Sequence, residues 1–203
     1  MSNYASNTDL LRAEIAAAAA RLIAEDGADY ATAKRKAAKQ ILGNARIRGE
    51  TMPDNTQIEE EVRRYNEIFF ADSQPVRLLH LRKVALRIMD DLAQFSPHLT
   101  GAVLNGTAGE HSDIHLQLFA DSAKDVEIFL INKNVDFEVS ETPHFRRGDP
   151  VETVSFLWQD EGVHLALYET DDLRGAVKVS PEGKLARAST DVVRTLIAEK
   201  EGP

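Results

Sequence analysis

Asp113 and His115 are residues whose types and spacing could hold a metal ion beside a phosphate group. They lie in the segment 113–120, where polar and apolar residues alternate strictly, which predicts a β-strand. Because successive side chains of a strand point to opposite faces, Asp113 and His115 should project side by side. The apolar set on the other face is Ile114, Leu116, Leu118 and Ala120. The sequence therefore predicts a carboxylate and an imidazole next to each other on one strand face.

A glycine turn is predicted just before this strand. The apolar run 101–105 is predicted as a short buried strand, and it ends at Gly106-Thr107. Backbone N–H groups of such a turn can hold phosphate oxygens, and glycine lets the phosphate approach closely. Thr107 and Ser112 would add hydroxyl groups.

Gly106, Thr107, Ser112 and Asp113 resemble the motif of the nucleotidyltransferase superfamily of polymerase-beta type. That motif is Gly-Ser/Thr, a loop, and then Ser-Asp-hydrophobic-Asp-hydrophobic. The resemblance covers roughly residues 76–169. It implies Asp113 and His115 as catalytic and metal-binding residues, Mg²⁺ or Mn²⁺ as the cofactor, and Gly106, Thr107 and Ser112 as nucleotide-binding residues. The implied reaction transfers a nucleoside monophosphate from a nucleoside triphosphate to a hydroxyl acceptor and releases pyrophosphate.

His115 departs from that motif, because the family has a second carboxylate there. Paired carboxylates hold two hard cations about 3.5–4 Å apart, and magnesium prefers oxygen ligands over imidazole. Two interpretations follow: a metal-dependent transferase, or a catalytically degenerate binding or regulatory protein of the same fold with a helical partner-docking module. A third is a helical interaction protein in which the α+β part is only a scaffold.

The third carboxylate of the family has no clear counterpart in the sequence. Glu152 and Glu169 lie on or beside predicted strands, where each could equally be a solvated residue. His164 could join Asp113 and His115 in a mixed nitrogen and oxygen set suited to manganese, zinc or iron, or it could be an ordinary surface histidine. His111 could meet a phosphate or have no such role.

The charge of the chain is unevenly distributed. The net charge is −9, and residues 98–203 hold 10 basic and 19 acidic side chains. The stretch 31–49 has basic residues and no acidic one, and either binds RNA, nucleotide phosphate or an acidic partner, or is a solvated helix face. The basic residues are Lys34, Arg35, Lys36, Lys39, Arg46 and Arg48. Arg146-Arg147 could likewise grip a triphosphate or be a solvated turn.

The absence of cysteine excludes thiol catalysis and cysteine-ligated zinc or iron–sulfur sites. The first residues contain no Lys or Arg, and the alanine run 16–20 is flanked by charged residues. We therefore expect neither a signal peptide nor a membrane span, and a cytoplasmic protein.

The spacing of apolar residues predicts a helical accessory module at 1–72 and a nucleotidyltransferase-like domain at 73–203. Helices are expected at 9–25, 29–42 and 54–70, with a fourth beginning at Pro75 and ending before Ser96-Pro97. Beyond the strands already named, the pattern predicts strands at 135–140, 151–159 and 163–169, and helices at 122–132 and 190–199. The expected fold class is α+β, a small mixed sheet with helices on one side, preceded by the helical module.

Overall fold

A computed structural model describes residues 7–43, 49–145, 148–173 and 186–201. The chain divides into two compact units. A helical unit comprises Met1–Arg77 with Thr107–His111, and an α+β unit comprises Leu78–Gly106 with Ser112–Pro203. Arg46, Arg48, Arg146 and Arg147, which the sequence singled out, lie outside the described residues.

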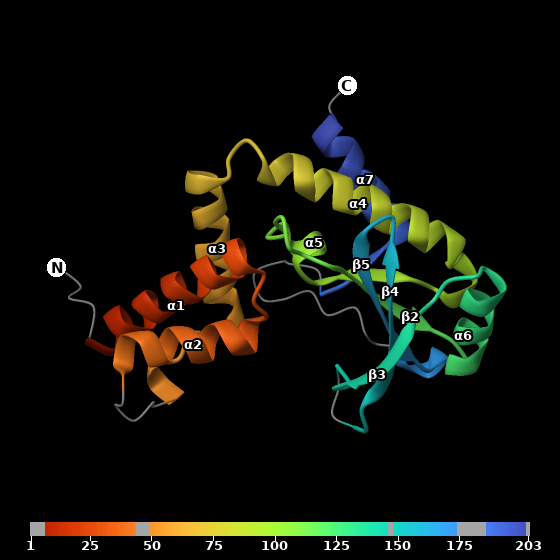
Figure 1. Ribbon diagram of the computed structural model, residues 1–203, viewed down its shortest axis with the longest axis horizontal. Helices are drawn as coiled ribbons and strands as arrows, with labels where there is room; N and C mark the ends of the chain where they lie inside the picture. The colour runs from red at the N-terminus through yellow and green to blue at the C-terminus, as the bar shows by residue number, and fades with distance from the viewer. Residues whose placement is uncertain (1–6, 44–48, 146–147, 174–185, 202–203) are drawn as a thin grey trace. The chain divides into compact units, whose positions relative to one another are not determined.

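The helical unit contains α1 (Asn7–Asp26), α2 (Tyr30–Leu42) and α3 (Asn55–Phe69) (Figure 1). Asp29 caps α2 by accepting a hydrogen bond from the Thr32 backbone N–H. Asp54 and Gln57 form the reciprocal capping box predicted for α3. The buried core is rich in alanine, and such small side chains let helices pack closely. Its members are Ile15, Ala16, Ala19, Ala20, Ala33, Ala37, Ala38, Ile58 and Val62.

The α+β unit is built around one mixed sheet, as the sequence predicted. Its strands are β1 (His98–Thr100), β2 (Ile114–Phe119), β3 (Glu138–Thr142), β4 (Val151–Trp158), β5 (Glu161–Tyr168) and β6 (Ala188–Ser189). The strand order is β3-β4-β5-β2-β1-β6. Only the β2–β5 pair is parallel among the described strand pairs. The fold class is α+β, with a helical region ahead of the sheet in the sequence.

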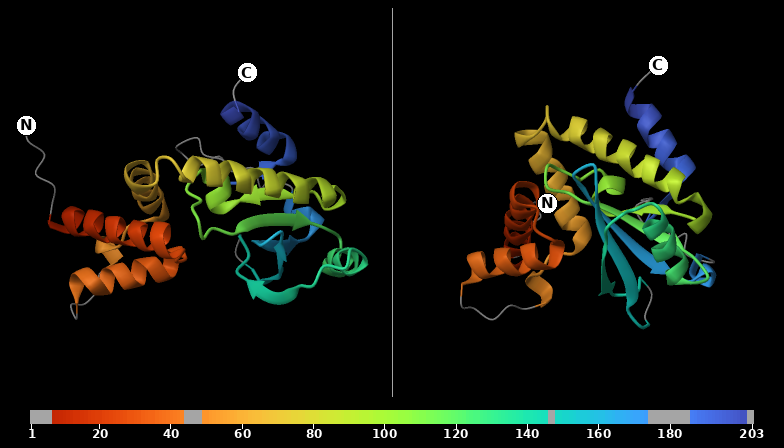
Figure 2. Two further views of the ribbon diagram at one scale, coloured as in Figure 1. Left: turned by 45° about the horizontal axis from the view of Figure 1, so that its top comes forward. Right: turned by 45° about the vertical axis from the view of Figure 1, so that its right-hand side comes forward.

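Helices α4 (Gln74–Asp91), α6 (Ala123–Asn132) and α7 (Thr190–Glu201) accompany the sheet. Figure 2 shows α4 and α7 on the same side of it. Helix α4 has Pro75 in its first turn, where the missing N–H costs no helical hydrogen bond. It buries Leu81, Ile88 and Met89, among others. Ile114, Leu116 and Leu118 of β2 are also buried, whereas His115 is exposed on the opposite face. The predicted alternation is confirmed from Ile114 to Leu118, whereas Phe119 is buried as well.

The predicted strand at 101–105 is wrong, because these residues form the short helix α5 (Gly101–Asn105). The strand lies just before it, at His98–Thr100. Gly101 and Gly106 bracket the helix with φ angles of 69° and 88°, a left-handed conformation that glycine adopts without strain. A short apolar run fits a buried helix turn as well as a strand, so periodicity could not separate the two.

The remaining elements differ from expectation mainly at their ends. The β4–β5 hairpin turns at Gln159 and Asp160, which both have positive φ. Because the turn takes only these two residues, β5 begins at Glu161, two residues earlier than predicted. Strand β3 begins at Glu138 instead of 135. No described helix has the length and hydropathy that crossing a membrane would require.

Candidate functional site

The exposed face of β2 and β5 brings together Asp113, His115 and His164. His115 pairs with His164 in the parallel register of the two strands. Their rings are stacked, with centroids 4.8 Å apart and planes inclined by 19°. Asp113 immediately precedes β2 and is exposed on the same face. His115 lies beside Asp113, as expected. His164 also lies beside Asp113, because β2 and β5, which are distant in sequence, pair with each other.

His164 is held by a hydrogen bond at each ring nitrogen. Its Nε2 lies 3.1 Å from Asp113 Oδ2, and its Nδ1 lies 2.8 Å from Ser155 Oγ. Ser155 is opposite His164 in the antiparallel register of β4 and β5. Ser155 was not predicted from the sequence, because a serine within a strand has no local signal. Only the strand pairing reveals its position.

His115 sits in a dense environment despite its exposed edge. Desolvation by the surrounding protein lowers the pKa of His115, and the neighbouring His164 lowers it further, while Asp113 acts in the opposite direction. The ring is therefore expected to be neutral near physiological pH. A neutral imidazole brings no negative charge to the position where the family motif has a carboxylate.

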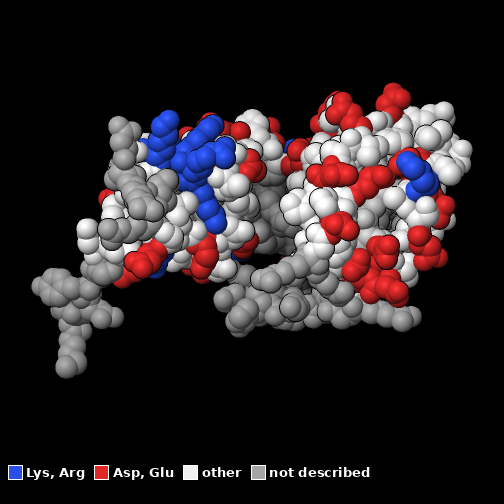
Figure 3. Space-filling view, turned by 90° about the horizontal axis from the view of Figure 1, so that it is seen from below, with Lys and Arg blue, Asp and Glu red and all other residues white. Residues whose placement is uncertain are grey.

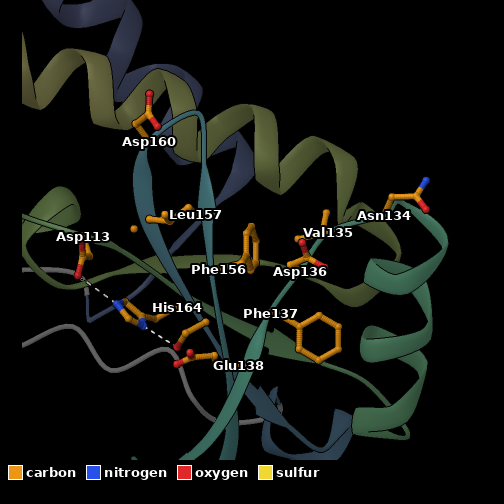
Figure 4. Close-up of a pocket in the computed structure, with 12 residues that line it drawn as sticks. Asp113, Asn134, Val135, Asp136, Phe137, Glu138, Phe156, Leu157, Asp160 and His164 are labelled. Carbon is orange, nitrogen blue, oxygen red and sulfur yellow. Dashed lines mark hydrogen bonds and ion pairs between the residues drawn. The ribbon is translucent and has the colours of Figure 1, made fainter.

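A cavity of about 890 Å³ opens beside this constellation. Asp113, Ser155 and His164 form part of its lining, with Phe137, Phe156 and Leu157 among the apolar contributors. Figure 4 shows Asp113 joined to His164 along one side, while Phe137 and Asp136 lie on the other. Four carboxylates line the cavity, and none of its described lining residues is Lys or Arg. They are Asp113, Asp136, Glu138 and Asp160.

Gly101 lies beside His115. A Cβ built on Gly101 would lie 3.8 Å from the Cβ of His115. Gly106 instead ends α5, where its N–H donates to the carbonyl of Ala102. Ser112, directly before Asp113, is partly buried. Within the α+β unit, Gly101 is in ordinary van der Waals contact with His115, whereas the backbone of Gly162 approaches Asp113 much more closely.

Thr107 lies in the segment that belongs to the helical unit. Its side chain and that of Ala108 are buried. Its carbonyl accepts a hydrogen bond from Asn66 Nδ2 at 3.4 Å, and the Ala108 carbonyl accepts one from Gln74 Nε2 at 2.8 Å. His111 packs against Gly27 in the same unit, where a Cβ on Gly27 would lie 2.6 Å from His111 Cβ. Nucleotide binding by Gly106, Thr107 and Ser112 stays a prediction.

The candidate third carboxylates do not join Asp113. Glu152 lies three positions before Ser155 on β4, so strand alternation places it on the opposite face. Burial and the neighbouring Glu127 raise the pKa of Glu152. Glu169 follows the end of β5, whereas Asp113 lies at the start of β2, across from the beginning of β5.

The donor set at Asp113 does not fit a pair of magnesium ions. It offers one carboxylate and two imidazoles, whereas magnesium prefers an octahedral set of oxygens. Asp113 Oδ2 and His164 Nε2 are already bonded to each other. Within the described residues, no group of three or more His, Asp or Glu side chains is arranged to hold a metal ion.

The predicted basic stretch lies partly on α2. Arg35, Lys36 and Lys39 are exposed there, and Lys34 is half-buried. The same helix turns Ala33, Ala37 and Ala38 into the core. Figure 3 shows basic side chains gathered on the helical unit. Helix α2 therefore presents a cationic outer face and keeps its apolar side for internal packing.

Comparison with known proteins adds little to this description. The chain matches no family model and no curated protein. It is similar to a chain in the solved structure of the GLD-2/RNP-8 complex, with 19% sequence identity and a TM-score of 0.31. The similarity covers 57% of this chain and 48% of that chain, so the match spans about half of the solved chain. A similarity this low carries no functional argument.

Proposed function

We propose that the α+β unit is a nucleotidyltransferase-like domain that binds a nucleoside triphosphate without catalysing the two-metal transfer reaction. The observation that carries this proposal is the His115–His164 stack beside Asp113. His115 stands where the family motif has its second carboxylate, and His164 occupies an oxygen of the first. Both changes remove oxygen ligands from the place where a pair of cations would sit.

Two features support retention of nucleotide binding. An imidazole at position 115 lowers the negative charge that a triphosphate would meet, compared with two adjacent carboxylates. Gly101 also has no side chain of its own beside His115, and Ser112 carries a hydroxyl directly before Asp113. We therefore place the phosphates near Gly101 and Ser112. Transfer of a nucleoside monophosphate to a hydroxyl acceptor is the alternative outcome.

The test combines titration calorimetry with an assay of pyrophosphate release. ATP, GTP, CTP and UTP would be titrated with and without Mg²⁺ or Mn²⁺. We expect binding of at least one nucleotide, no pyrophosphate release, and affinity that changes little when the metal is removed. Absence of binding for all four would overturn the proposal, and pyrophosphate release by the wild-type protein would favour the enzyme.

Variants make the same test sharper. Ser112→Ala should weaken nucleotide binding, whereas Ser140→Ala at an exposed position of β3 serves as the matched control. His115→Asp restores the carboxylate of the motif. If it gains metal-dependent binding or turnover, the loss of activity lies at that position. If His115→Asp changes neither metal-dependent binding nor turnover, the loss of activity has causes beyond position 115.

We also propose that the cationic face of α2 binds single-stranded RNA. Arg35, Lys36 and Lys39 project from a short stretch without a neighbouring acidic residue, and phosphate contacts of this kind need only positive charge. Ala33, Ala37 and Ala38 of this helix are buried in the core and so cannot enter a membrane, which argues against membrane insertion.

Fluorescence anisotropy with a labelled RNA oligomer tests this second proposal. The Lys36→Glu and Lys39→Glu pair should abolish binding, and Lys200→Glu on α7 is the matched control. The logarithm of the association constant should fall with that of salt concentration by about 0.7 for each phosphate contacted. Binding that is insensitive to salt or to the α2 variants would overturn it.

A further inference from the structure

Ser155, His164 and Asp113 form an uninterrupted chain of hydrogen bonds across three neighbouring segments of the sheet. The Oγ–Nδ1 distance is 2.8 Å and the Nε2–Oδ2 distance is 3.1 Å. We propose that Ser155 is a nucleophile activated by His164, with Asp113 orienting the imidazole. The chemistry is acyl transfer from a neutral or cationic ester or amide. This activity goes beyond nucleotide binding, because no nucleotide takes part in it.

The direction of the hydrogen bonds follows from the chemistry of the groups. An ionised carboxylate only accepts, so His164 Nε2 must carry the hydrogen that points to Asp113. The neutral ring then has its lone pair on Nδ1, where it accepts from the Ser155 hydroxyl. Asp113 thus selects the tautomer in which His164 can remove the serine proton. The roles of the three groups are those of a serine–histidine–aspartate triad, although the two ring nitrogens are exchanged.

The fold holds these groups in place through backbone pairing. Ser155 and His164 are directly opposite on β4 and β5, where cross-strand side chains lie on the same face. Asp113 enters from the start of β2, which pairs with β5 on its other side. The His115 ring stacks on His164 and packs against one of its faces. The imidazole is therefore bonded at both nitrogens and supported from one side.

Ser155 is accessible to a ligand, because it lines the cavity together with His164 and Asp113. The volume of about 890 Å³ lies within the usual range for small-molecule sites. Asp136, Glu138 and Asp160 give the surroundings a negative potential, with no Lys or Arg among the described lining residues. An anionic substrate is disfavoured inside this cavity, whereas a neutral or amine-bearing one is accepted. Gly101 and Ser112, where we place the triphosphate, are not among the described residues that line the cavity. Phe137 and Leu157 provide apolar contact.

The reaction proceeds in two balanced steps. Ser155 Oγ attacks the carbonyl carbon while its proton moves to His164 Nδ1. The bond to the leaving alcohol or amine breaks, and the leaving group takes that proton, which leaves an acyl ester on Ser155. Water then attacks the ester and transfers a proton to His164. The carboxylic acid departs, and the proton returns to Ser155.

The experiment measures covalent labelling of the full chain by a fluorophosphonate probe, with the modified residue located by mass spectrometry. We expect one adduct, on Ser155. The labelling rate should fall roughly a hundredfold or more in His164→Gln and Asp113→Asn, because both lose general-base assistance. Ser155→Ala should lose the adduct, whereas Ser140→Ala on the exposed edge strand should label like the wild type.

Two outcomes would overturn the proposal. One is wild-type protein with no adduct on Ser155, and the other is a labelling rate that survives His164→Gln. Circular dichroism and thermal unfolding of each variant distinguish loss of the nucleophile from loss of the fold. p-Nitrophenyl esters with neutral, cationic and anionic acyl groups test the substrate class. Equal hydrolysis of all three would overturn the charge preference.

Discussion

Gly162 lies directly against the carboxyl group of Asp113. A Cβ built on Gly162 would be 2.6 Å from Asp113 Cγ, which is closer than any real Cβ contact allows. Asp113 therefore occupies the space that a side chain at position 162 would fill. The glycine at this position is explained by close approach, because Gly162 is not among the described residues with positive φ. His164, which is hydrogen-bonded to the same Asp113 carboxylate, follows Gly162 by two positions on β5.

Gly162→Ala should displace Asp113 and break its hydrogen bond to His164 while the strand stays formed. Nuclear magnetic resonance of the His164 ring nitrogens should show the loss as a mixture of the two tautomers. Gly148→Ala is the matched control, since nothing lies within 4 Å of a Cβ there. A single unchanged tautomer in Gly162→Ala would show that Asp113 does not orient the ring.

Gln74→Ala should loosen the segment 107–111. Gln74 Nε2 donates to the carbonyl of Ala108, and removing a partner of a buried carbonyl costs about 1–3 kcal/mol. We expect the free energy of unfolding to drop within that range and hydrogen exchange at 108–111 to accelerate. The exposed Gln40→Ala should change neither. Unchanged exchange in Gln74→Ala would mean that Asn66 and Arg77, which donate to the Thr107 and Glu110 carbonyls, hold the segment without Gln74.

Arg82→Met should destabilise the α+β unit. Arg82 is buried, and its guanidinium donates to the carbonyls of Val103 and Leu104 at 3.0 and 3.1 Å. These carbonyls belong to α5, whose C-terminal end needs donors. Loss of two charge-assisted bonds should cost about 3 kcal/mol in urea unfolding. Arg82→Lys should recover only part of this, because a single ammonium lacks the planar fork. Arg87→Met, at an exposed site on the same helix, should cost little.

Stability should fall as the solution is acidified, and His98 should contribute to the fall. Burial lowers the pKa of His98, an effect increased by Arg187 and opposed by the hydrogen bond to the Ser96 carbonyl. The unfolded chain, with the ordinary value of about 6.5, then binds the proton more readily than the folded one. The stabilisation is complete above pH 6.5 and is lost as the pH falls towards the folded value.

The measurement for His98 is the free energy of unfolding between pH 5 and 7.5, for the wild type and His98→Asn. Asparagine can still donate to the Ser96 carbonyl but does not titrate. The variant should show a shallower dependence on pH. Equal slopes for the two proteins would contradict burial of His98 as a cause.

Local signals predicted the helices well and the site only in part. Asp29 and the Asp54–Gln57 pair marked helix starts that the structure confirms, because capping depends on residues close in sequence. The alternation around Asp113 and His115 likewise fixed their common face. Ser155 and Gly162 could not be found this way. Their roles depend on β5 lying between β4 and β2, and strand order is a property of the whole sheet.

The parallel pairing of β2 with β5 also has a consequence for how the protein acquires its site during synthesis. The Asp113–His164 bond joins residues 51 positions apart, with β3, β4 and α6 between them in the sequence. Contacts between residues this far apart form late in folding, because the entropy cost of closing a long loop must be met before the contact can stabilise the chain. A nascent chain that has emerged only as far as β3 would carry Asp113 and His115 but neither Ser155 nor His164. The Asp113–His164 hydrogen bond can therefore form only after β4 and β5 have been synthesised.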